Sequence, residues 1–264
     1  MREPALSLRP MLIRLLPALV FAALLALGVH ALSAPAAGVP RLPDLDQEPP
    51  SELVITRAKG EYRLGFRSAV RNVGAGPLII TGSRPDRGMD HMVADQSIEQ
   101  TDAPEQLVRG VGRLRYVVSP DHRHWHYLGF ERYELARPDG RTLVRDRKSG
   151  FCLGDRYTVD GMTPANPEYT SRCGLGEPAR LGITEGISVG YGDDYPANLE
   201  GQYLKLSGLS NGRYLLIHRV NADRKLRESR YDNDAASVLF ELRWRKGVPR
   251  IKPLATCPDK AICR

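Results

Sequence analysis

The sequence predicts an all-β protein, an antiparallel β-sandwich whose long loops carry the functional site. Short runs with apolar side chains at every second position recur along the chain, separated by turn signals such as Asn211-Gly212. Sustained helical periodicity is nearly absent, and no internal repeat is evident. Hydrophobic residues make up 42% and charged residues 26% of the 264 residues, which is an ordinary globular composition. This length allows one large domain or two small ones.

Residues 1–36 are expected to be a secretory signal peptide. Three arginines precede the apolar run 15–29, and small residues follow it. The run is short for a membrane span of roughly 20 residues, although an uncleaved signal-anchor stays open as an alternative. Residues 37–51 are rich in proline and are expected to form an extended linker. Residues 52–264 then form the folded domain, in the periplasm or outside the cell.

The first strands are expected before residue 82, over residues 52–57, 62–71 and 77–81. In the second run, apolar side chains occupy one parity and arginines the other, the pattern of a half-buried strand. Residues 83–102 are polar without a clear period, and they are expected to form a long loop. A loop of this length in a compact domain is often functional.

The second half of the chain continues with strands and one long irregular segment. Strands are expected over residues 107–118, 142–145, 202–206, 213–220 and 236–244, and over 127–135 as the continuation of the first of these. Pro138-Asp139-Gly140 predicts a hairpin turn between two of them. Residues 148–200 are rich in Gly, Pro, Asp and Tyr, and are expected to form loops over the sandwich.

Three histidines at alternate positions, His122, His124 and His126, are the strongest functional signal. On a strand they share one face, while Trp125 and Tyr127 point to the other face and toward the core. In a flat strand the outer two Cα atoms would be about 13 Å apart, so one ion can be shared only where the strand curves, twists or ends. An all-imidazole set favours copper or zinc.

The four cysteines, Cys152, Cys173, Cys257 and Cys263, are an even number behind an export signal and are expected to form two disulfides. Pairing Cys152 with Cys173 and Cys257 with Cys263 is the simplest of three connectivities. The sequence leaves the other two open.

The net charge of +7 falls to +5 when three arginines and one glutamate are removed with residues 1–36. The remaining basic residues are interspersed with acids, which argues against nucleic acid as a partner. A membrane is a partner only if the signal is not cleaved.

Several segments resemble one family when they are taken in order. The histidine motif is followed by Lys148-Ser-Gly-Phe-Cys-Leu-Gly-Asp155, by Gly186-Ile-Ser-Val-Gly-Tyr-Gly-Asp-Asp-Tyr195, by Gly201-Gln-Tyr203 and by Glu228-Ser-Arg-Tyr-Asp-Asn233. This series resembles the catalytic domain of the lysyl oxidase family in its prokaryotic-type form, over roughly residues 50–245. The resemblance implies oxidative deamination of primary amines with copper and a quinone made from the protein's own side chains.

The resemblance also implies roles for particular residues. The three histidines match the family's copper ligands, and Lys148 and Tyr195 match the pair that forms lysyl tyrosylquinone. Tyr191 is a nearby competitor that would require a gap in the alignment. Arg132 stands where the family has a further histidine, so the role of that histidine does not carry over to this chain.

The expected function is therefore an exported copper/quinone amine oxidase of the protein-lysine 6-oxidase type. Its partners are molecular oxygen and a primary amine, either a lysine side chain or a small amine, and its products are an aldehyde, hydrogen peroxide and ammonia. Asp155, Asp193 and Asp194 are candidates for the base that removes the substrate's α-proton. One alternative is a copper-binding sandwich module that does not complete the quinone. Another is a hydrolytic zinc site, which the lack of a glutamate beside the histidines disfavours.

Overall fold

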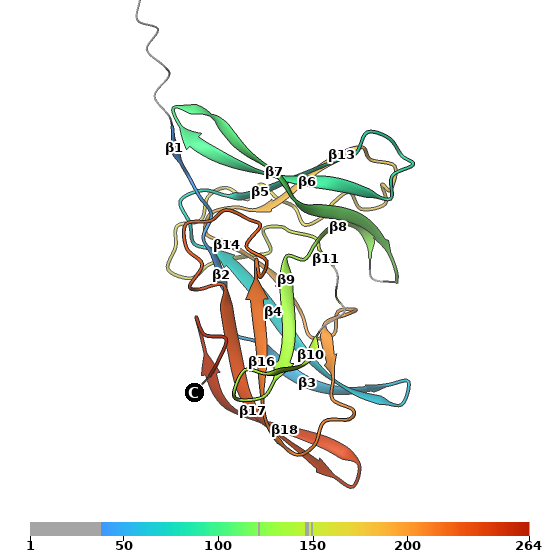
Figure 1. Cartoon of the computed structure of the whole chain (residues 1–264). Coiled ribbons are helices and arrows are strands. Elements are labelled where there is room, and N and C mark those ends of the chain that lie inside the picture. Colours follow the sequence, from blue (N-terminus) through green and yellow to red (C-terminus); the bar gives the residue numbers. More distant parts are fainter. Residues whose placement is uncertain (1–37, 121, 146–147, 149, 264) are drawn as a thin grey trace, which may run out of the picture. The chain divides into compact units, whose positions relative to one another are not determined.

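The computed structural model describes residues 38–120, 122–145, 148 and 150–263, and this part of the chain is all-β. Every regular element in it is a strand, and all paired strands run antiparallel (Figure 1). The fold class expected from the sequence is confirmed. The expected signal peptide lies outside the described residues. Across the described ranges, no helix has the length and apolar character that crossing a membrane requires.

The strands form three sheets. The seven-stranded sheet contains β1 (Val39–Pro40), β5 (Leu78–Ser83), β6 (His91–Thr101), β7 (Ala103–Val118), β8 (Arg123–Leu128), β11 (Gly150–Phe151) and β13 (Gly182–Ile187). The six-stranded sheet contains β2 (Leu45–Gln47), β3 (Ser51–Ala58), β4 (Glu61–Asn72), β12 (Tyr157–Thr158), β14 (Tyr191–Tyr195) and β15 (Tyr203–Lys205). The five-stranded sheet contains β9 (Glu131–Ala136), β10 (Thr142–Arg145), β16 (Gly212–Val220), β17 (Ala235–Arg245) and β18 (Val248–Cys257).

The core joins the six-stranded and five-stranded sheets through aromatic side chains. Phe66 of β4 packs edge-to-face on Tyr133 of β9, with 4.9 Å between ring centroids. His218 of β16 lies against both rings and is fully buried, as expected for a histidine in so apolar a strand. Fully burying a side chain of the size of phenylalanine contributes about 1.5–3 kcal/mol. This aromatic layer fixes β4 and β9, the strands that border the site.

Two segments expected to lack regular structure contain strands. The expected linker 37–51 contains β1 and β2, and Leu45 of β2 is fully buried. The expected loop 83–102 contains β6, which is central in its sheet because it pairs with both β5 and β7. Its buried apolar side chains, Met92, Ala94 and Ile98, share one parity, but buried Gln96 falls on the same parity and hides the period. The Gln96 amide donates to the carbonyl of Arg227.

The expected continuous strand over 127–135 is wrong, because it is interrupted at Gly129 and Phe130. Gly129 has φ of +78°, a left-handed conformation that glycine adopts without strain. The chain turns there, so β8 belongs to the seven-stranded sheet and β9 to the five-stranded sheet. The hairpin expected at Pro138-Asp139-Gly140 is confirmed by the antiparallel pairing of β9 with β10.

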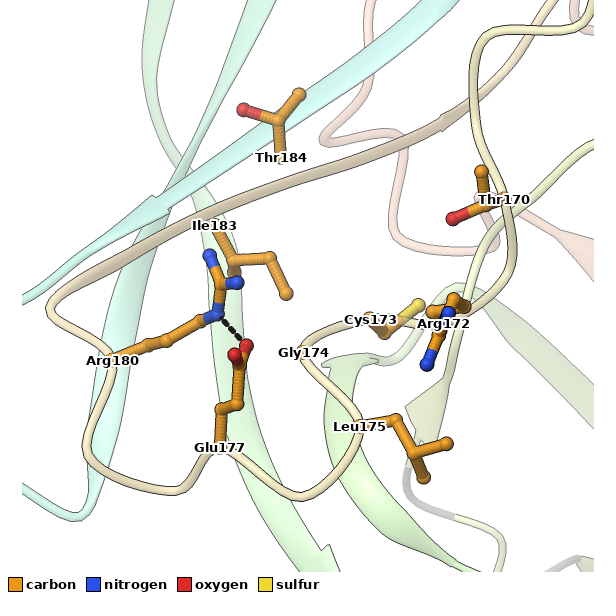
Figure 2. Close-up of a pocket in the computed structure, with 9 residues that line it drawn as sticks. All are labelled: Thr170, Arg172, Cys173, Gly174, Leu175, Glu177, Arg180, Ile183 and Thr184. Atoms are coloured by element: carbon orange, nitrogen blue, oxygen red, sulfur yellow. Dashed lines mark hydrogen bonds and ion pairs between the residues drawn. The ribbon is translucent and has the colours of Figure 1, made fainter.

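The long segment 148–200 is mostly irregular, as expected, but it includes the four short strands β11 to β14. Its loop before β13 lines a pocket of about 340 Å³, and Arg180 and Glu177 of this lining form an ion pair (Figure 2). The disulfide between Cys152 and Cys173 anchors this loop. The second disulfide joins Cys257 to Cys263, so the simplest connectivity expected from the sequence is confirmed.

Candidate metal and lysine–tyrosine site

The three alternating histidines converge at the start of β8. His124 and His126 lie on the strand, and His122 lies just before it in a turn that is closed by backbone hydrogen bonds with Ser119. His122 Nδ1 is 3.4 Å from His124 Nε2, which is 2.8 Å from His126 Nε2. One ring nitrogen of each residue lies within 4.8 Å of the others. The turn at the strand's end removes the separation that a flat strand would impose.

Two of the three histidines are held in the neutral form, chiefly by burial. Burial, followed by the charges of neighbouring residues, lowers the pKa of His124 to about 4 and that of His126 to about 2. A neutral imidazole presents a lone pair, which is the form that binds a metal ion. The donor set is all nitrogen and converges on one point, and it therefore fits copper or zinc.

A second group of potential ligands does not fit a metal. Cys152, Cys173 and Glu185 lie within 4.8 Å of one another, but the two cysteines form a disulfide and offer no thiolate. The Glu185 carboxylate accepts a hydrogen bond from the backbone N–H of Leu153, and burial raises its pKa well above the usual range. This group is a structural part of the loop.

Lys148 and Tyr195 meet beside β8, although 47 positions separate them in the sequence. Lys148 precedes β11, which pairs with β8, and Tyr195 ends β14, which pairs with β4. The Lys148 Nζ atom lies 4.0 Å from the centroid of the Tyr195 ring and 4.6 Å from that of Phe151. It donates a hydrogen bond of 2.9 Å to Gln202 Oε1. The competing tyrosine, Tyr191, lies at the other end of β14, where it pairs with Thr158 of β12.

The Tyr195 hydroxyl is buried beside a carboxylate. It lies 2.7 Å from Asp193 Oδ2 and 2.9 Å from the carbonyl oxygen of Cys152. Asp193 also accepts a 2.6 Å hydrogen bond from Arg156. Burial raises the pKa of Asp193 to about 7 although the Arg156 charge opposes the change, and burial together with Asp193 holds the pKa of Tyr195 well above its usual range.

The other two carboxylates considered as bases have structural contacts instead. Asp155 accepts hydrogen bonds from the backbone N–H groups of Glu168, Tyr169 and Ser188, and so ties the loop together. Asp194 points to the other face of β14 and pairs with an arginine at 3.0 Å. Among the three, only Asp193 contacts Tyr195.

Sequence reasoning missed two buried polar residues beside Lys148. Glu131 accepts hydrogen bonds from Tyr133 and Ser68, and burial raises its pKa to about 6 while Tyr133 and the Lys148 charge oppose the rise. Gln202 is fully buried and is the hydrogen-bond acceptor for Lys148. The sequence could have indicated Glu131, because this charged residue occupies one of the alternate strand positions whose side chains point into the core.

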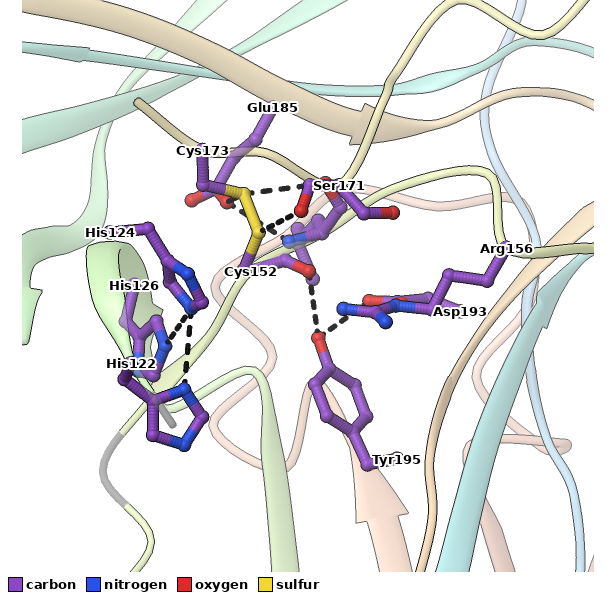
Figure 3. The surroundings of a disulfide bond; sticks show 11 residues. His122, His124, His126, Cys152, Arg156, Ser171, Cys173, Glu185, Asp193 and Tyr195 are labelled. Carbon is purple, nitrogen blue, oxygen red and sulfur yellow. Dashed lines mark hydrogen bonds and ion pairs between the residues drawn. A yellow bond between two sulfur atoms is a disulfide. The ribbon is translucent and has the colours of Figure 1, made fainter. Parts of the chain in front are cut away.

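One cystine braces both halves of the site. The backbone carbonyl of Cys173 accepts a 2.8 Å hydrogen bond from the N–H of Trp125, which lies between two of the histidines. The carbonyl of Cys152 contacts the Tyr195 hydroxyl. Figure 3 shows the histidine cluster on one side of this disulfide and Tyr195 on the other.

The sequence model of the lysyl oxidase family matches residues 110–247, just over half of the chain. The chain belongs to the lysyl oxidase family. The match includes the histidine cluster, Lys148 and Tyr195. The chain is 29% identical over 126 residues to lysyl oxidase homolog 3A of Danio rerio. It is 28% identical to lysyl oxidase homolog 3 of Homo sapiens over 125 residues, and to homolog 2 of Gallus gallus over 124.

These alignments cover 47% of this lysyl oxidase-family chain but only 15–16% of the three relatives. The relatives are therefore much longer proteins that share one region with this chain.

Proposed function

We propose that this chain is a copper-dependent amine oxidase that converts primary amines to aldehydes, with hydrogen peroxide and ammonia as the other products. The observation that carries the proposal is the position of Lys148 Nζ, 4.0 Å from the centre of the Tyr195 ring. Two side chains that must become covalently linked in a lysyl tyrosylquinone are already in contact. Holding reacting groups together in this way removes a large part of the barrier to such a reaction.

The metal in this proposal is copper, held by His122, His124 and His126. The support is the convergence of three imidazole nitrogens without a carboxylate among them, at a place where burial keeps His124 and His126 neutral. A hydrolytic zinc site would need a general base at the metal, and Asp193, the carboxylate beside Tyr195, is instead engaged with Tyr195 and Arg156.

Copper held there would supply oxygen activation for oxidising the tyrosine ring, and the quinone would supply the electron acceptor for amine oxidation. The chain's own residues prepare this chemistry. Asp193 lies where it can take the proton of the Tyr195 hydroxyl, and Arg156 stands 5.3 Å from the ring centroid as the balancing charge. Phe151 packs edge-to-face on Tyr195 and excludes water from the ring. Asp193 is also our candidate for the base that removes the substrate's α-proton.

The proposed location is outside the cytoplasm, in the periplasm or beyond the cell, after removal of residues 1–36. Two disulfides among four cysteines support an oxidising compartment. The proposed partners are a primary amine, carried by a protein lysine or a small molecule, and molecular oxygen.

The test is to load the purified protein with copper in air and to compare it with a Lys148→Ala variant, before and after phenylhydrazine. We expect a visible quinone band and a Lys148–Tyr195 cross-linked peptide, both absent from Lys148→Ala and present in a Lys246→Ala control. The hydrazine should trap the band. If copper binds but neither band nor cross-link forms, the chain is the copper-binding sandwich module that the sequence left as the alternative.

A further inference from the structure

A groove of about 990 Å³ reaches Lys148 from the surface of the domain. Residues of β3, β4 and β15 line it, together with β10 and the loop 197–201. Lys148 is packed against that loop, because a Cβ atom on Gly201 would lie 3.8 Å from the Lys148 side chain. Lys148, whose amine lies over the Tyr195 ring, is therefore part of the groove's lining.

The groove is large for a simple amine. Pockets for small molecules span about 300–1,000 Å³, and this one lies at the upper limit. Its lining comes from four strands, and among the described residues β10 is the edge strand of its sheet, with β9 as its neighbour in the sheet order. An unpaired strand edge of this kind can accept an extended peptide through main-chain hydrogen bonds.

The lining side chains carry more positive than negative charge. Five of them are lysine or arginine and two are glutamate. Lys205 is neutralised by Glu61 at 2.7 Å, and Arg145 is paired with Glu134 at 3.1 Å.

Two of the cations have no such partner. Within the described ranges, Lys59 and Arg63 pair with no carboxylate; Lys59 is exposed and Arg63 is partly exposed. The Arg63 guanidinium rests over the Tyr203 ring at 4.1 Å, which leaves its donors available to an anionic group.

We propose, on the basis of the function above, that this groove binds an extended acidic peptide and that the lysine oxidised is one flanked by Asp or Glu. A substrate amine is itself a cation, and it must approach through a positively charged groove. Acidic neighbours in the substrate offset that repulsion by pairing with Lys59 and Arg63. A polyamine or a basic peptide adds further positive charge and is disfavoured.

The experiment compares two peptides with one central lysine, flanked either by glutamates or by arginines. Amine oxidation is measured by peroxide release from the copper-loaded protein at low and high ionic strength. Binding is measured separately, by fluorescence anisotropy of the same peptides with norleucine in place of lysine. The binding assay needs no quinone, so a failure of the proposed oxidase and a failure of this inference are distinguishable.

We expect the acidic peptides to be favoured by on the order of tenfold at low salt, in both assays, with the difference shrinking at high salt. Lys59→Glu should reduce the preference several-fold, and Arg63→Gln should weaken it as well. Lys246→Glu is the matched control. Lys246, like Lys59, is an exposed lysine with φ of 50° before a turn glycine, but it does not line the groove.

Equal binding of the two peptides, or a preference for the basic one, would overturn the inference even if both were oxidised. An acidic preference that survives in Lys59→Glu and Arg63→Gln would also overturn it, because the groove would then not be its source. Preferential binding of the acidic norleucine peptide without oxidation of either lysine peptide would support the groove and reject the oxidase.

Discussion

The histidine cluster and the Lys148–Tyr195 pair are adjacent, but they are assembled in opposite ways. The histidines are neighbours in sequence, and the periodicity of one strand with a turn at its end places their nitrogens together. Lys148 and Tyr195 come from segments that pair with different strands of different sheets. The metal half of the site is thus local, whereas the lysine–tyrosine half depends on the whole fold.

The largest effect is expected from removing a local ligand. His126→Ala should lower copper affinity by at least about 100-fold, because even outer contacts to a ligand are typically worth 10–100-fold. Equilibrium dialysis followed by metal analysis measures this. His91→Ala is the control, since His91 is a histidine of β6 that contacts Asp90. If both variants bind copper as tightly as the parent, the cluster is not the metal site.

Next in size is the effect of the disulfide that braces both halves. Replacing Cys152 and Cys173 with serine should lower the free energy of unfolding by about 3 kcal/mol, as expected for a loop of this length. Replacing Cys257 and Cys263 should cost only about 2 kcal/mol, because that loop closes over a sequence separation of 6 rather than 21. Denaturant unfolding under non-reducing conditions compares them. A larger loss from the C-terminal pair would contradict the assignment of the first disulfide as the brace.

The sequence was sufficient for the local half of the site and for the strands with a clear period. The spacing of the three histidines needs no tertiary information, and neither does the strand character of 62–71. The segment 83–102 was expected to be a loop but contains β6. Its strand pattern was hidden because a buried glutamine interrupts the series of buried apolar side chains. The contact of Lys148 with Gln202 could not be derived from strand patterns, since it depends on how β11 and the loop before β15 approach each other.

Gln202 allows the lysine–tyrosine half to be disturbed alone. Gln202→Leu removes the acceptor that holds Lys148 over the ring, so we expect cross-link formation to slow by on the order of tenfold while copper affinity is unchanged. Gln202→Glu keeps an acceptor but adds a negative charge that favours the protonated amine. Its cross-linking should therefore recover as pH rises, which a merely structural role would not produce. Peptide mapping of the Lys148–Tyr195 product after timed exposure to copper and air measures both variants; unchanged rates in both would show that Gln202 does not position the lysine.

The smallest effect concerns the charge beside Tyr195. Burial raises the pKa of Asp193 to about 7, whereas an aspartate in the unfolded chain titrates near 4. Between these pH values the folded protein holds a proton that the unfolded chain has lost. This contribution to stability is therefore complete below about pH 4 and is lost as the pH rises to about 7.

Asp193→Asn removes that titration, so its free energy of unfolding should fall less steeply with pH than that of the parent, by at most about 1.4 kcal/mol per pH unit. Urea unfolding at a series of pH values gives the difference between the two slopes. Glu228→Gln is the control, because Glu228 is also buried, has a pKa raised to about 8 and contacts Leu45 and Asn221 instead of Tyr195. Both variants should flatten the slope, but only Asp193→Asn should also slow cross-linking. Parallel curves for Asp193→Asn and the parent would mean that Arg156 keeps Asp193 ionised throughout, and the carboxylate would then be a fixed acceptor for the Tyr195 proton.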